Sequence, residues 1–480
     1  MRGLLRKYDS LPLPAKAAFW FAVCSALQSG VSFLAIPFQT RLMSQEQYGI
    51  VTLYNSWRQI VIIFATLNIY SGVFNTGMVK WSNSRDAYLS SMVGLTAVLT
   101  AVTTVFYLVL QAHLNAMFQL TTSFVLVMMA QILASTVFSL WSARQRFEYR
   151  YVSILVATIF YTAASQAISI ACTVFLGGPD DKALISVASL AVSTLVVAIV
   201  LTAVIARKSA VFIDLTYWKH AVLFNLPLVP HYLSTLILGQ ADRIMISSMV
   251  GTAEAAIYGV AYTIGLMIQV VAGAITNAVI PLMYEKLGKR DSSGISALVE
   301  SLVLCVGIVD TLAILVAPEI MAIAAPPSYA GAVYVIPPVA LSMLLAFTYG
   351  LFANVEFFYE KNLFIMAASL IAAVANVALN LFFIPLFGYL AAGYATLVCY
   401  GLLAFAHFQF ASRAAREAGI IGLFRGGRIT ACLAFFALPA VVAISLYPYA
   451  IPRYAFVLIL LAAAIWKRSA ITSTLKQIKA

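Results

Sequence analysis

Apolar residues follow one another along this chain in runs of about twenty, and short polar segments separate the runs. Each run is long enough to cross a bilayer as a helix, and the runs lack the strict alternation of barrel strands. Because backbone groups in lipid must be hydrogen-bonded internally, the pattern predicts an all-α membrane protein. We expect a polytopic bundle of about fourteen transmembrane helices, near residues 16–38, 48–70, 87–110, 119–142, 151–176, 183–206, 220–241, 255–280, 294–317, 331–355, 362–384, 390–412, 429–447 and 453–466.

Composition and the placement of charge agree with this prediction. Hydrophobic residues make up 63% of the 480 residues and charged residues 10%, whereas about a quarter of a soluble domain is charged. The 29 Lys and Arg residues gather in alternate loops, and the opposite loops hold only Arg41, Lys182, Arg243 and Arg453. Since cytoplasmic loops collect positive charge, we expect both termini to be cytoplasmic. The net charge of +12 then requires no nucleic-acid partner.

The chain lacks the features of an enzyme. Its polar segments are too short for a soluble catalytic domain, and no G-x-x-x-x-G-K-[ST] motif is present to bind ATP. All five cysteines lie inside the apolar runs, without a C-x-x-C pair, so we expect buried hydrophobic residues rather than metal ligands or disulfides. The first run is longer than that of a secretory signal, which predicts an uncleaved first helix. We therefore expect a transporter without a cofactor, driven by an ion gradient, the membrane potential or the substrate gradient.

A short motif that occurs twice in the chain suggests a duplicated architecture. Glu46 with Tyr48-Gly49 lies at the start of the second run, and Glu254 with Tyr258-Gly259 lies at the start of the eighth. This spacing fits two six-helix lobes in the same orientation, followed by two more helices. We predict an N-terminal lobe at 1–210, a C-terminal lobe at 211–413, and helices 13 and 14 with a cytoplasmic tail at 414–480.

Arg58 is the one cation in the interior of a predicted span, away from its ends. It lies about eleven residues into the second run, roughly 16 Å deep at 1.5 Å per residue, which is near the middle of the bilayer. A charge there is costly and points to function. A guanidinium could bind a phosphate in bidentate fashion; alternatively it pairs with a carboxylate or with carbonyl groups to fix the bundle.

Two further residues are candidates for ion coupling. Asp310, within the ninth run, could bind a proton or a cation, or it could be the structural partner of an arginine such as Arg58. His231 follows Pro227 and Pro230 in the seventh run, where the prolines predict a bend or an opening of the helix. His231 either satisfies a freed carbonyl or a hydroxyl, or it serves as a proton or substrate site at this hinge.

Asp242 and Arg243 adjoin near the outer end of the same run and cannot face each other on a helix. Each therefore needs another partner, either a structural tie to Arg41 or Glu46 of the first lobe or a contact with substrate. We assign Arg243, with Arg58, to substrate binding. Arg41, Glu46 and Asp242, with the two prolines, are assigned to structure and gating.

These segments together resemble a known family. The stretch Arg41–Gly49 resembles the signature after the first helix of bacterial O-antigen and polysaccharide flippases. The stretches Pro227–His231, Asp242–Ile246 and Ile257–Tyr262 are similar to the seventh and eighth helices of that family, and Pro281 is another point of similarity. The family belongs to the multidrug/oligosaccharidyl-lipid/polysaccharide exporter superfamily.

The resemblance implies a bacterial inner-membrane protein with two six-helix lobes, a V-shaped central cavity and alternating access. It implies transport of oligosaccharide units linked to undecaprenyl pyrophosphate, for O-antigen, lipopolysaccharide or exopolysaccharide synthesis, with a polymerase implied as a partner by the pathway. Arg58 would suit the pyrophosphate head group, although few cations lie within the spans. The alternative is an ion-coupled multidrug exporter of the same superfamily. A membrane-embedded glycosyltransferase, polymerase or ligase would require a large outer loop, which this sequence lacks.

Overall fold

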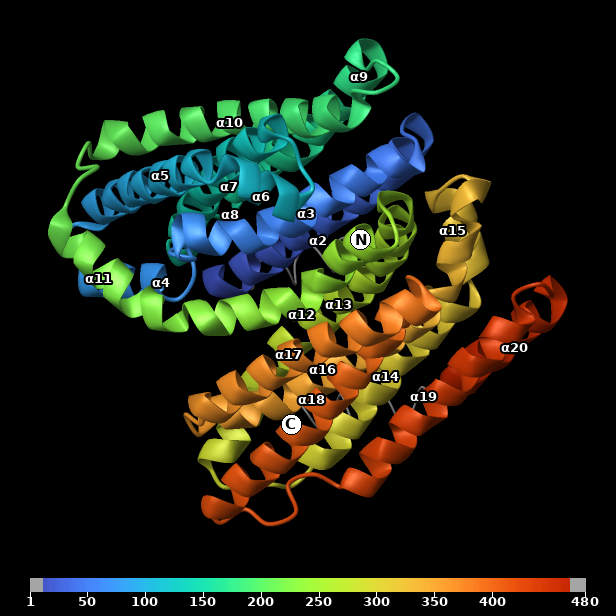
Figure 1. Ribbon diagram of the computed structural model, residues 1–480. Coiled ribbons are helices and arrows are strands. Elements are labelled where there is room, and N and C mark those ends of the chain that lie inside the picture. The colour runs from blue at the N-terminus through green and yellow to red at the C-terminus, as the bar shows by residue number, and fades with distance from the viewer. Residues whose placement is uncertain (1–11, 467–480) are drawn as a thin grey trace, which may run out of the picture. The chain divides into compact units, whose positions relative to one another are not determined.

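The computed structural model describes residues 12–466, and every regular element in this part of the chain is a helix (Figure 1). The all-α fold predicted from the sequence is confirmed. The chain divides into two compact units, Met1–Gln240 and Ala241–Ala480, and the division falls inside helix α12 (Val229–Met249). The boundary predicted at residues 210 and 211 lies in the non-helical segment 209–214. The two termini, predicted to be cytoplasmic, lie outside the described residues.

The first unit contains long helices joined by short turns, together with three helices of eight residues each. Its helices are α2 (Leu13–Leu42), α3 (Gln45–Thr66), α4 (Val73–Lys80), α5 (Arg85–Val109), α6 (Gln111–Phe118), α7 (Thr122–Phe147), α8 (Tyr151–Thr158), α9 (Ser165–Leu176), α10 (Lys182–Lys208), α11 (Leu215–Asn225) and the first part of α12. A π-helical turn, Ile159–Ala164, joins α8 to α9, so that the two form one continuous rod. α10 packs against α7 and α9, and α7 also packs against α5.

The second unit begins within α12 and continues to the end of the described chain. Its other elements are α13 (Thr252–Gly288), α14 (Ile295–Leu315), α15 (Ala317–Ala324), a 3-10 segment (Pro327–Tyr334), α16 (Ile336–Phe358), α17 (Asn362–Phe387), α18 (Leu390–Glu417), α19 (Gly426–Leu446) and α20 (Ala450–Trp466). The most extensive helix pairing in this unit joins α16 to α18, and α17 also packs along α18.

Twelve helices in the described part of the chain are long and apolar enough to cross a membrane. Two predicted spans fall outside this set. The apolar part of α20, Ala450–Ala462, is short. Helix α3 has 22 residues but is less apolar, because Asn55, Arg58 and Gln59 lie in its middle. The structure therefore has two fewer apolar spans than the fourteen predicted, because α3 contains a polar segment and the final helix, α20, is short.

Side-chain caps and proline positions explain where several of these helices begin or break. The hydroxyl of Ser44 accepts a hydrogen bond from the backbone N–H of Gln47 at the start of α3, and Asp214 caps α11 in the same way. Pro227 and Pro230 have no N–H to donate, and the helix is interrupted by a 3-10 turn, Leu226–Leu228, between α11 and α12. The break predicted from the two prolines is confirmed.

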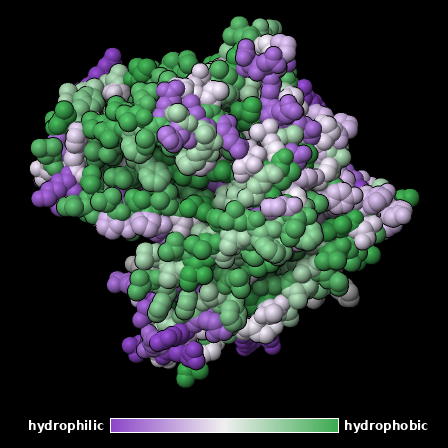
Figure 2. Space-filling model, viewed as in Figure 1, coloured by the Kyte–Doolittle hydropathy of each residue, from purple (hydrophilic) through white to green (hydrophobic). Residues whose placement is uncertain are grey.

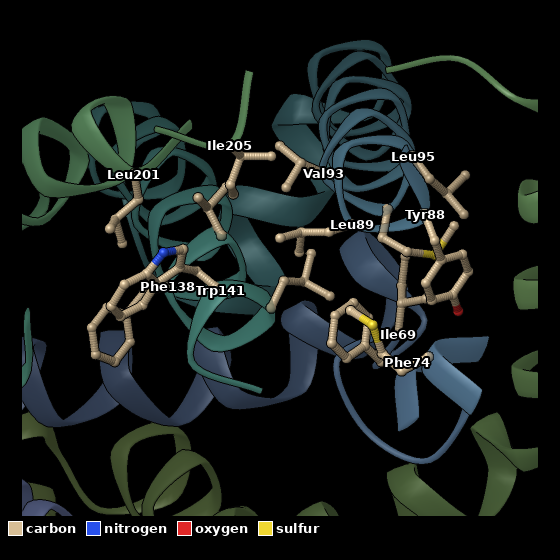
Figure 3. Packing of buried hydrophobic residues seen from close by; sticks show 14 of the residues in the cluster. Ile69, Phe74, Tyr88, Leu89, Val93, Leu95, Phe138, Trp141, Leu201 and Ile205 are labelled. Atoms are coloured by element: carbon tan, nitrogen blue, oxygen red, sulfur yellow. The ribbon is translucent and has the colours of Figure 1, made fainter. Parts of the chain in front are cut away.

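A buried apolar cluster holds the first unit together. Figure 3 shows Leu89 and Val93 of α5 directed toward Ile205 of α10 in this cluster, to which Trp141 of α7 also belongs. The surface of the molecule has the opposite arrangement to that of a soluble protein. Figure 2 shows mainly hydrophobic residues on the visible face, with hydrophilic residues gathered toward the helix ends. Exposed apolar side chains of this kind are expected where helices face lipid.

An ion pair links the short helix α15 to the last described helix, α20. Both guanidinium nitrogens Nη1 and Nη2 of Arg453 donate to the Glu319 carboxylate, at 2.5 and 2.7 Å, and the Tyr454 hydroxyl donates to it at 2.6 Å. Arg453 is 3% exposed and also donates to the Leu315 carbonyl. The hydrogen bond from Arg453 lowers the pKa of Glu319 to about 2.

We predict that this ion pair makes stability depend on pH in the acidic range. Because the pKa of Glu319 is lower in the folded protein than its ordinary value of 4.5, the contact contributes fully above about pH 4.5. Its contribution is lost as the pH falls from there toward 2. Thermal unfolding of the detergent-purified protein should therefore lose less stability over this range in Glu319→Gln than in wild type. Glu360→Gln, at an exposed carboxylate, is the control; equal losses in all three proteins would contradict the prediction.

Candidate functional site

Helix α3 carries polar residues in the middle of a membrane-length helix. Arg58 and Gln59 lie near its centre, one turn after Asn55. The helix packs against α5, α7 and α10, so other helices cover several of its sides. A helix in this position can present polar side chains to the interior of the protein instead of to lipid.

A polar cavity of about 320 Å³ opens beside this part of α3, inside the first unit. Residues of α3, α7 and α12 line it, together with the turn after α3. Its hydrogen-bonding groups are those of Arg58, Gln59, Asn68, Tyr70, Ser135, Ser139, Tyr232 and Thr235. Ser135 and Ser139 lie four residues apart on α7, which places both hydroxyls on one face of that helix. None of the described residues that line the cavity carries a carboxylate.

The turn after α3 has an unusual backbone that brings Asn68 and Tyr70 to the cavity. Leu67 and Asn68 have φ values of 49° and 53°, in the left-handed region that a leucine seldom adopts. The backbone N–H of Asn68 donates to the hydroxyl of Thr66, which holds the turn in place. Strain of this kind persists where the surrounding structure fixes it, and it is common beside binding sites.

Arg58 has an uncompensated charge at the wall of this cavity. Its side chain is half-buried, and its Nε atom is buried without a hydrogen-bond partner. Among the described residues, neither an ion pair nor a hydrogen bond involves its guanidinium. The ionisable side chains that interact electrostatically with Arg58 are the phenols of Tyr54, Tyr70 and Tyr161. The structure thus gives Arg58 no carboxylate partner, and the guanidinium is available to an anion that enters the cavity.

His231 lies just after the break in the seventh predicted span. Its side chain is half-buried, and its Nδ1 atom is buried without a hydrogen-bond partner. The next residue, Tyr232, lines the cavity with Thr235. The break at Leu226–Leu228 therefore lies close along the chain to one wall of the cavity.

A closed hydrogen-bond network surrounds Asp242 in the core of the second unit. Asp242 is 1% exposed. Its Oδ2 atom accepts hydrogen bonds from Tyr258 of α13 at 2.5 Å and from Thr396 of α18 at 2.6 Å, and its Oδ1 atom accepts one from Asn380 of α17 at 2.7 Å. Asn380 also donates to Asn376, and Asn376 donates to Thr396, which closes the ring.

This network is rich in oxygen atoms that a cation could use. Asp242 supplies a carboxylate, Thr396 and Tyr258 supply hydroxyls, and the two asparagines supply amide oxygens. The amide oxygen of Asn380 is buried without a hydrogen-bond partner. One carboxylate among neutral oxygens suits a monovalent cation or a proton, because divalent ions usually take more carboxylate ligands. In the described part of the chain, no group of three or more His, Cys, Asp or Glu residues could hold a metal ion.

The other charged candidates occupy separate places. Arg243 is 7% exposed, and its guanidinium lies over the Tyr262 ring, 4.0 Å from the ring centre. Arg41 is exposed and donates to the Pro37 carbonyl at 2.9 Å. Glu46 is exposed in the first turn of α3. All three donors to Asp242 come from the second unit, so its carboxylate is satisfied without a charged residue of the first.

Asp310 of α14 is a buried carboxyl with no hydrogen-bond partner. The residue is fully buried, and both of its oxygens lack a hydrogen-bond partner among the described residues. The next side chain, Thr311, also has a hydroxyl without a partner. An uncompensated charge in such a place is so costly that the side chain should hold a proton. In the described part of the chain Asp310 is not paired with an arginine, and its role in coupling stays a prediction.

Sequence reasoning missed most of the Asp242 network. Asp242 stood out because a charge in an apolar run is rare, but Asn376, Asn380 and Thr396 are neutral and common in membrane helices. One signal was available in the spacing of the asparagines. Asn376 and Asn380 are four residues apart in an otherwise apolar helix, which places both amides on one face.

The sequence matches the family described as polysaccharide biosynthesis protein over residues 15–287. A curated relative, Lsg locus putative protein 1 of Haemophilus influenzae, is 25% identical over 162 residues. That match covers 32% of this chain and 39% of the relative.

The fold is similar to those of solved membrane transporters. The chain is similar to the lipid II flippase MurJ in an inward closed conformation, with a TM-score of 0.68 and 11% identity over 96% of this chain and 99% of that chain. A multidrug resistance MATE family transporter of the MOP superfamily is similar in its inward-facing conformation, with a TM-score of 0.63 and 12% identity. That match covers 82% of this chain and 98% of the transporter. An outward-facing conformation of a MATE family transporter is similar with a TM-score of 0.58 and 15% identity. That match covers 84% of this chain and 96% of the transporter. At these identities the similarity shows a shared fold.

We predict that the cavity beside Arg58 is filled with water and open to small polar reagents. Ser139→Cys, in a variant whose native cysteines are replaced, should react with a membrane-impermeant methanethiosulfonate. Thr136→Cys is the matched control, because Thr136 lies on the same helix but is fully buried. Inorganic pyrophosphate should slow the reaction at position 139 if Arg58 binds anions. Equal labelling at both positions, or none at 139, would contradict an open polar cavity.

Proposed function

The chain belongs to the polysaccharide biosynthesis protein family, and from this membership we propose that it is a flippase for lipid-linked oligosaccharides. It moves an oligosaccharide unit attached to undecaprenyl pyrophosphate across a bacterial inner membrane by alternating access. The translocated units serve the synthesis of O-antigen or another surface polysaccharide.

The unpaired guanidinium of Arg58 carries this proposal. A membrane protein seldom keeps an uncompensated cation at mid-depth unless an anion or water reaches it. A guanidinium presents its N–H donors in a planar fork that matches two oxygens of a phosphate. Because the described lining of the cavity has a cation and no carboxylate, it favours an anionic ligand over a cationic drug, which would meet Arg58 without a compensating negative charge.

The remaining lining of the cavity suits sugars next to the phosphates. Ser135, Ser139, Asn68 and Gln59 offer donors and acceptors for hydroxyl groups, and Tyr70 or Tyr232 offers an aromatic face. The volume of about 320 Å³ is at the lower end of the range for small-molecule sites, about 300–1,000 Å³. A cavity of this size accommodates the head group and the first sugar, while the polyprenyl tail remains in the bilayer.

The break between α11 and α12 is the proposed gating element. Pro227 and Pro230 interrupt the helix there, and α12 then continues from the first unit into the second. Hinges absorb changes of backbone angles at a few residues near the ends of regular elements. Movement at this break would shift Tyr232 and Thr235 and thereby change access to the cavity.

The Asp242 network is the proposed binding site of the coupling ion. A cation among these oxygens would compensate the carboxylate and would pull the Asn376 and Asn380 amide oxygens toward Asp242. Because Asp242 lies on α12, which also lines the substrate cavity, binding of the ion would act on the helix that moves. Asp310 and His231 are retained as further candidates for proton coupling.

We predict that substitution of Arg58 removes transport without removing the protein. Arg58→Ala should lower the affinity of the purified protein for undecaprenyl pyrophosphate about 10- to 100-fold, as expected for the loss of charge-assisted hydrogen bonds. Arg58→Lys keeps the positive charge but loses the planar fork of N–H donors, and it should lower the affinity less than Arg58→Ala does. In cells, Arg58→Ala should abolish surface polysaccharide at a normal protein level.

Arg207→Gln is the control for this experiment, because Arg207 is an exposed cation at the end of α10. Arg58→Ala protein in normal amount with unchanged polysaccharide would refute the head-group role. Unchanged glycan lipid together with altered tolerance to amphiphilic drugs would instead favour the multidrug exporter.

We also predict that a monovalent cation stabilises the second unit through Asp242. The melting temperature of the purified protein should rise when sodium replaces choline at constant ionic strength, because a ligand that binds only the folded state stabilises it. Asp242→Asn and Thr396→Val should both lose this rise, whereas Glu46→Gln should keep it. The same melting temperature in sodium, potassium and choline would contradict a metal-cation site and would leave the proton as the coupling ion.

A further inference from the structure

A histidine and a glutamate form an isolated pair inside the second unit, apart from the network at Asp242. His407 of α18 and Glu356 of α16 are both fully buried, and the His407 Nδ1 atom lies 2.9 Å from the Glu356 Oε1 atom. The two helices that carry them form the most extensive helix pairing in this unit. The pair is therefore held by well-packed elements of the second unit.

Each member of the pair has a second polar atom without a partner. The Nε2 atom of His407 and the Oε2 atom of Glu356 are buried, and neither has a hydrogen-bond partner among the described residues. A purely structural histidine normally has both ring nitrogens hydrogen-bonded, because a buried polar atom without a partner is costly. The two unused atoms indicate that the pair accepts a proton or a water molecule at some stage.

The charges of the pair fix how many protons it holds. A neutral imidazole beside an ionised carboxylate leaves one net negative charge in an apolar core, which is strongly unfavourable. One additional proton removes this charge, whether it lies on the imidazole or on the carboxyl. While it is buried, the pair therefore holds one proton more than a neutral imidazole beside an ionised carboxylate. It can release this additional proton only when water or another acceptor reaches it.

Few other ionisable groups approach the pair. The Tyr349 ring stacks on the His407 ring at 5.2 Å between ring centres, and the Tyr400 ring stacks on Tyr349 at 6.1 Å. The helices packed against α16 and α18 carry other titratable groups. These are Glu254, Tyr258, Tyr262, Tyr284, Glu285 and Lys286 on α13, Glu300, Cys305 and Asp310 on α14, Tyr329 and Tyr334 on the 3-10 segment, Tyr394, Cys399, Arg413, Arg416 and Glu417 on α18 itself, and Arg428 and Cys432 on α19, with none on α17. Within the described residues, no hydrogen bond or ion pair joins these groups to His407 or Glu356.

The position of the pair relates it to the Asp242 network. Thr396, Tyr400 and His407 share one face of α18, because spacings of four and eleven residues are close to whole turns. Eleven residues at 1.5 Å per residue separate Thr396 from His407 by about 16 Å along the helix. The pair thus lies toward the opposite end of α18, the end that the charge pattern predicts to be cytoplasmic.

We propose that His407 and Glu356 form a proton-exchange site of the second unit, at the predicted cytoplasmic ends of α16 and α18. A proton from water binds the pair when these helix ends open, and the carboxylate charge is neutralised. The same proton returns to water when the site opens again, so no other reactant is needed. In the buried state the proton is trapped, which allows the occupancy of the site to control when α16 and α18 separate. Its role in transport rests on the proposed flippase function, whereas proton binding itself does not.

Infrared difference spectroscopy of the purified full-length protein tests proton binding without any substrate. A step in pH should change the carboxyl signal of the wild-type protein. Glu356→Gln should remove one component of this signal, and His407→Gln should shift the pH at which that component appears. Glu417→Gln is the matched control, because Glu417 lies on α18 but is exposed and paired with Lys361 and Arg413. A carboxyl signal unchanged in both Glu356→Gln and His407→Gln would overturn the proposal.

A transport assay then separates this proposal from the proposed function. Proteoliposomes that contain undecaprenyl-pyrophosphate-linked glycan should flip it faster when a pH gradient is applied, and Glu356→Gln and His407→Gln should lose this acceleration. A flipping rate that does not depend on the pH gradient and is normal in both variants would overturn the role of the pair in transport. The proposed flippase function would be unaffected by that result. An absence of flipping in wild type would refute the proposed function, and the infrared titration would still decide whether the pair binds a proton. If Glu356→Gln does not fold, His407→Gln and the wild-type titration provide the test.

Discussion

The cost of placing charge and unpaired polar groups in a bilayer determines the rest of this structure. It requires helical backbone throughout the membrane, and it permits ionisable side chains only where another group, water or a proton compensates them. Each buried ionisable residue can therefore be classified by what compensates it. Arg453 has Glu319, Asp242 has three donors, and Glu356 has His407, whereas Asp310 has no hydrogen-bond partner among residues 12–466. Arg58 borders a polar cavity and has no partner there in the described part of the chain.

The two units use polar groups in different ways. The first unit has an open cavity with one free cation and neutral hydrogen-bonding groups, which suits a large anionic ligand that enters and leaves. The second unit has two enclosed polar sites, the network around Asp242 and the His407–Glu356 pair, which suit small ions. In the proposed cycle the substrate binds mainly in the first unit and the ions bind in the second. Helix α12 connects the two roles, because its first part lines the cavity and its second part carries Asp242.

Much of the fold could be predicted from the sequence, because lipid imposes a simple pattern on helices that cross it. The all-α bundle and the break at Pro227 and Pro230 follow from apolar length and from proline chemistry. Arg58 stood out because its charge interrupts an apolar run. The cavity and the Asp242 network could not be predicted, because both depend on which faces of distant helices meet. Asn380, Thr396 and His407 are ordinary in sequence, and only packing places the first two beside Asp242 and the third beside Glu356.

We propose that this protein moves undecaprenyl-pyrophosphate-linked glycan from the inner to the outer leaflet. The most direct test measures on which side of the inner membrane that glycan lipid lies in the host, with and without the gene. Deletion should make the lipid accumulate at the cytoplasmic leaflet, and the wild-type gene should reverse this whereas Arg58→Ala should not. An unchanged distribution after deletion, in a host with no second flippase for the same lipid, would contradict the account.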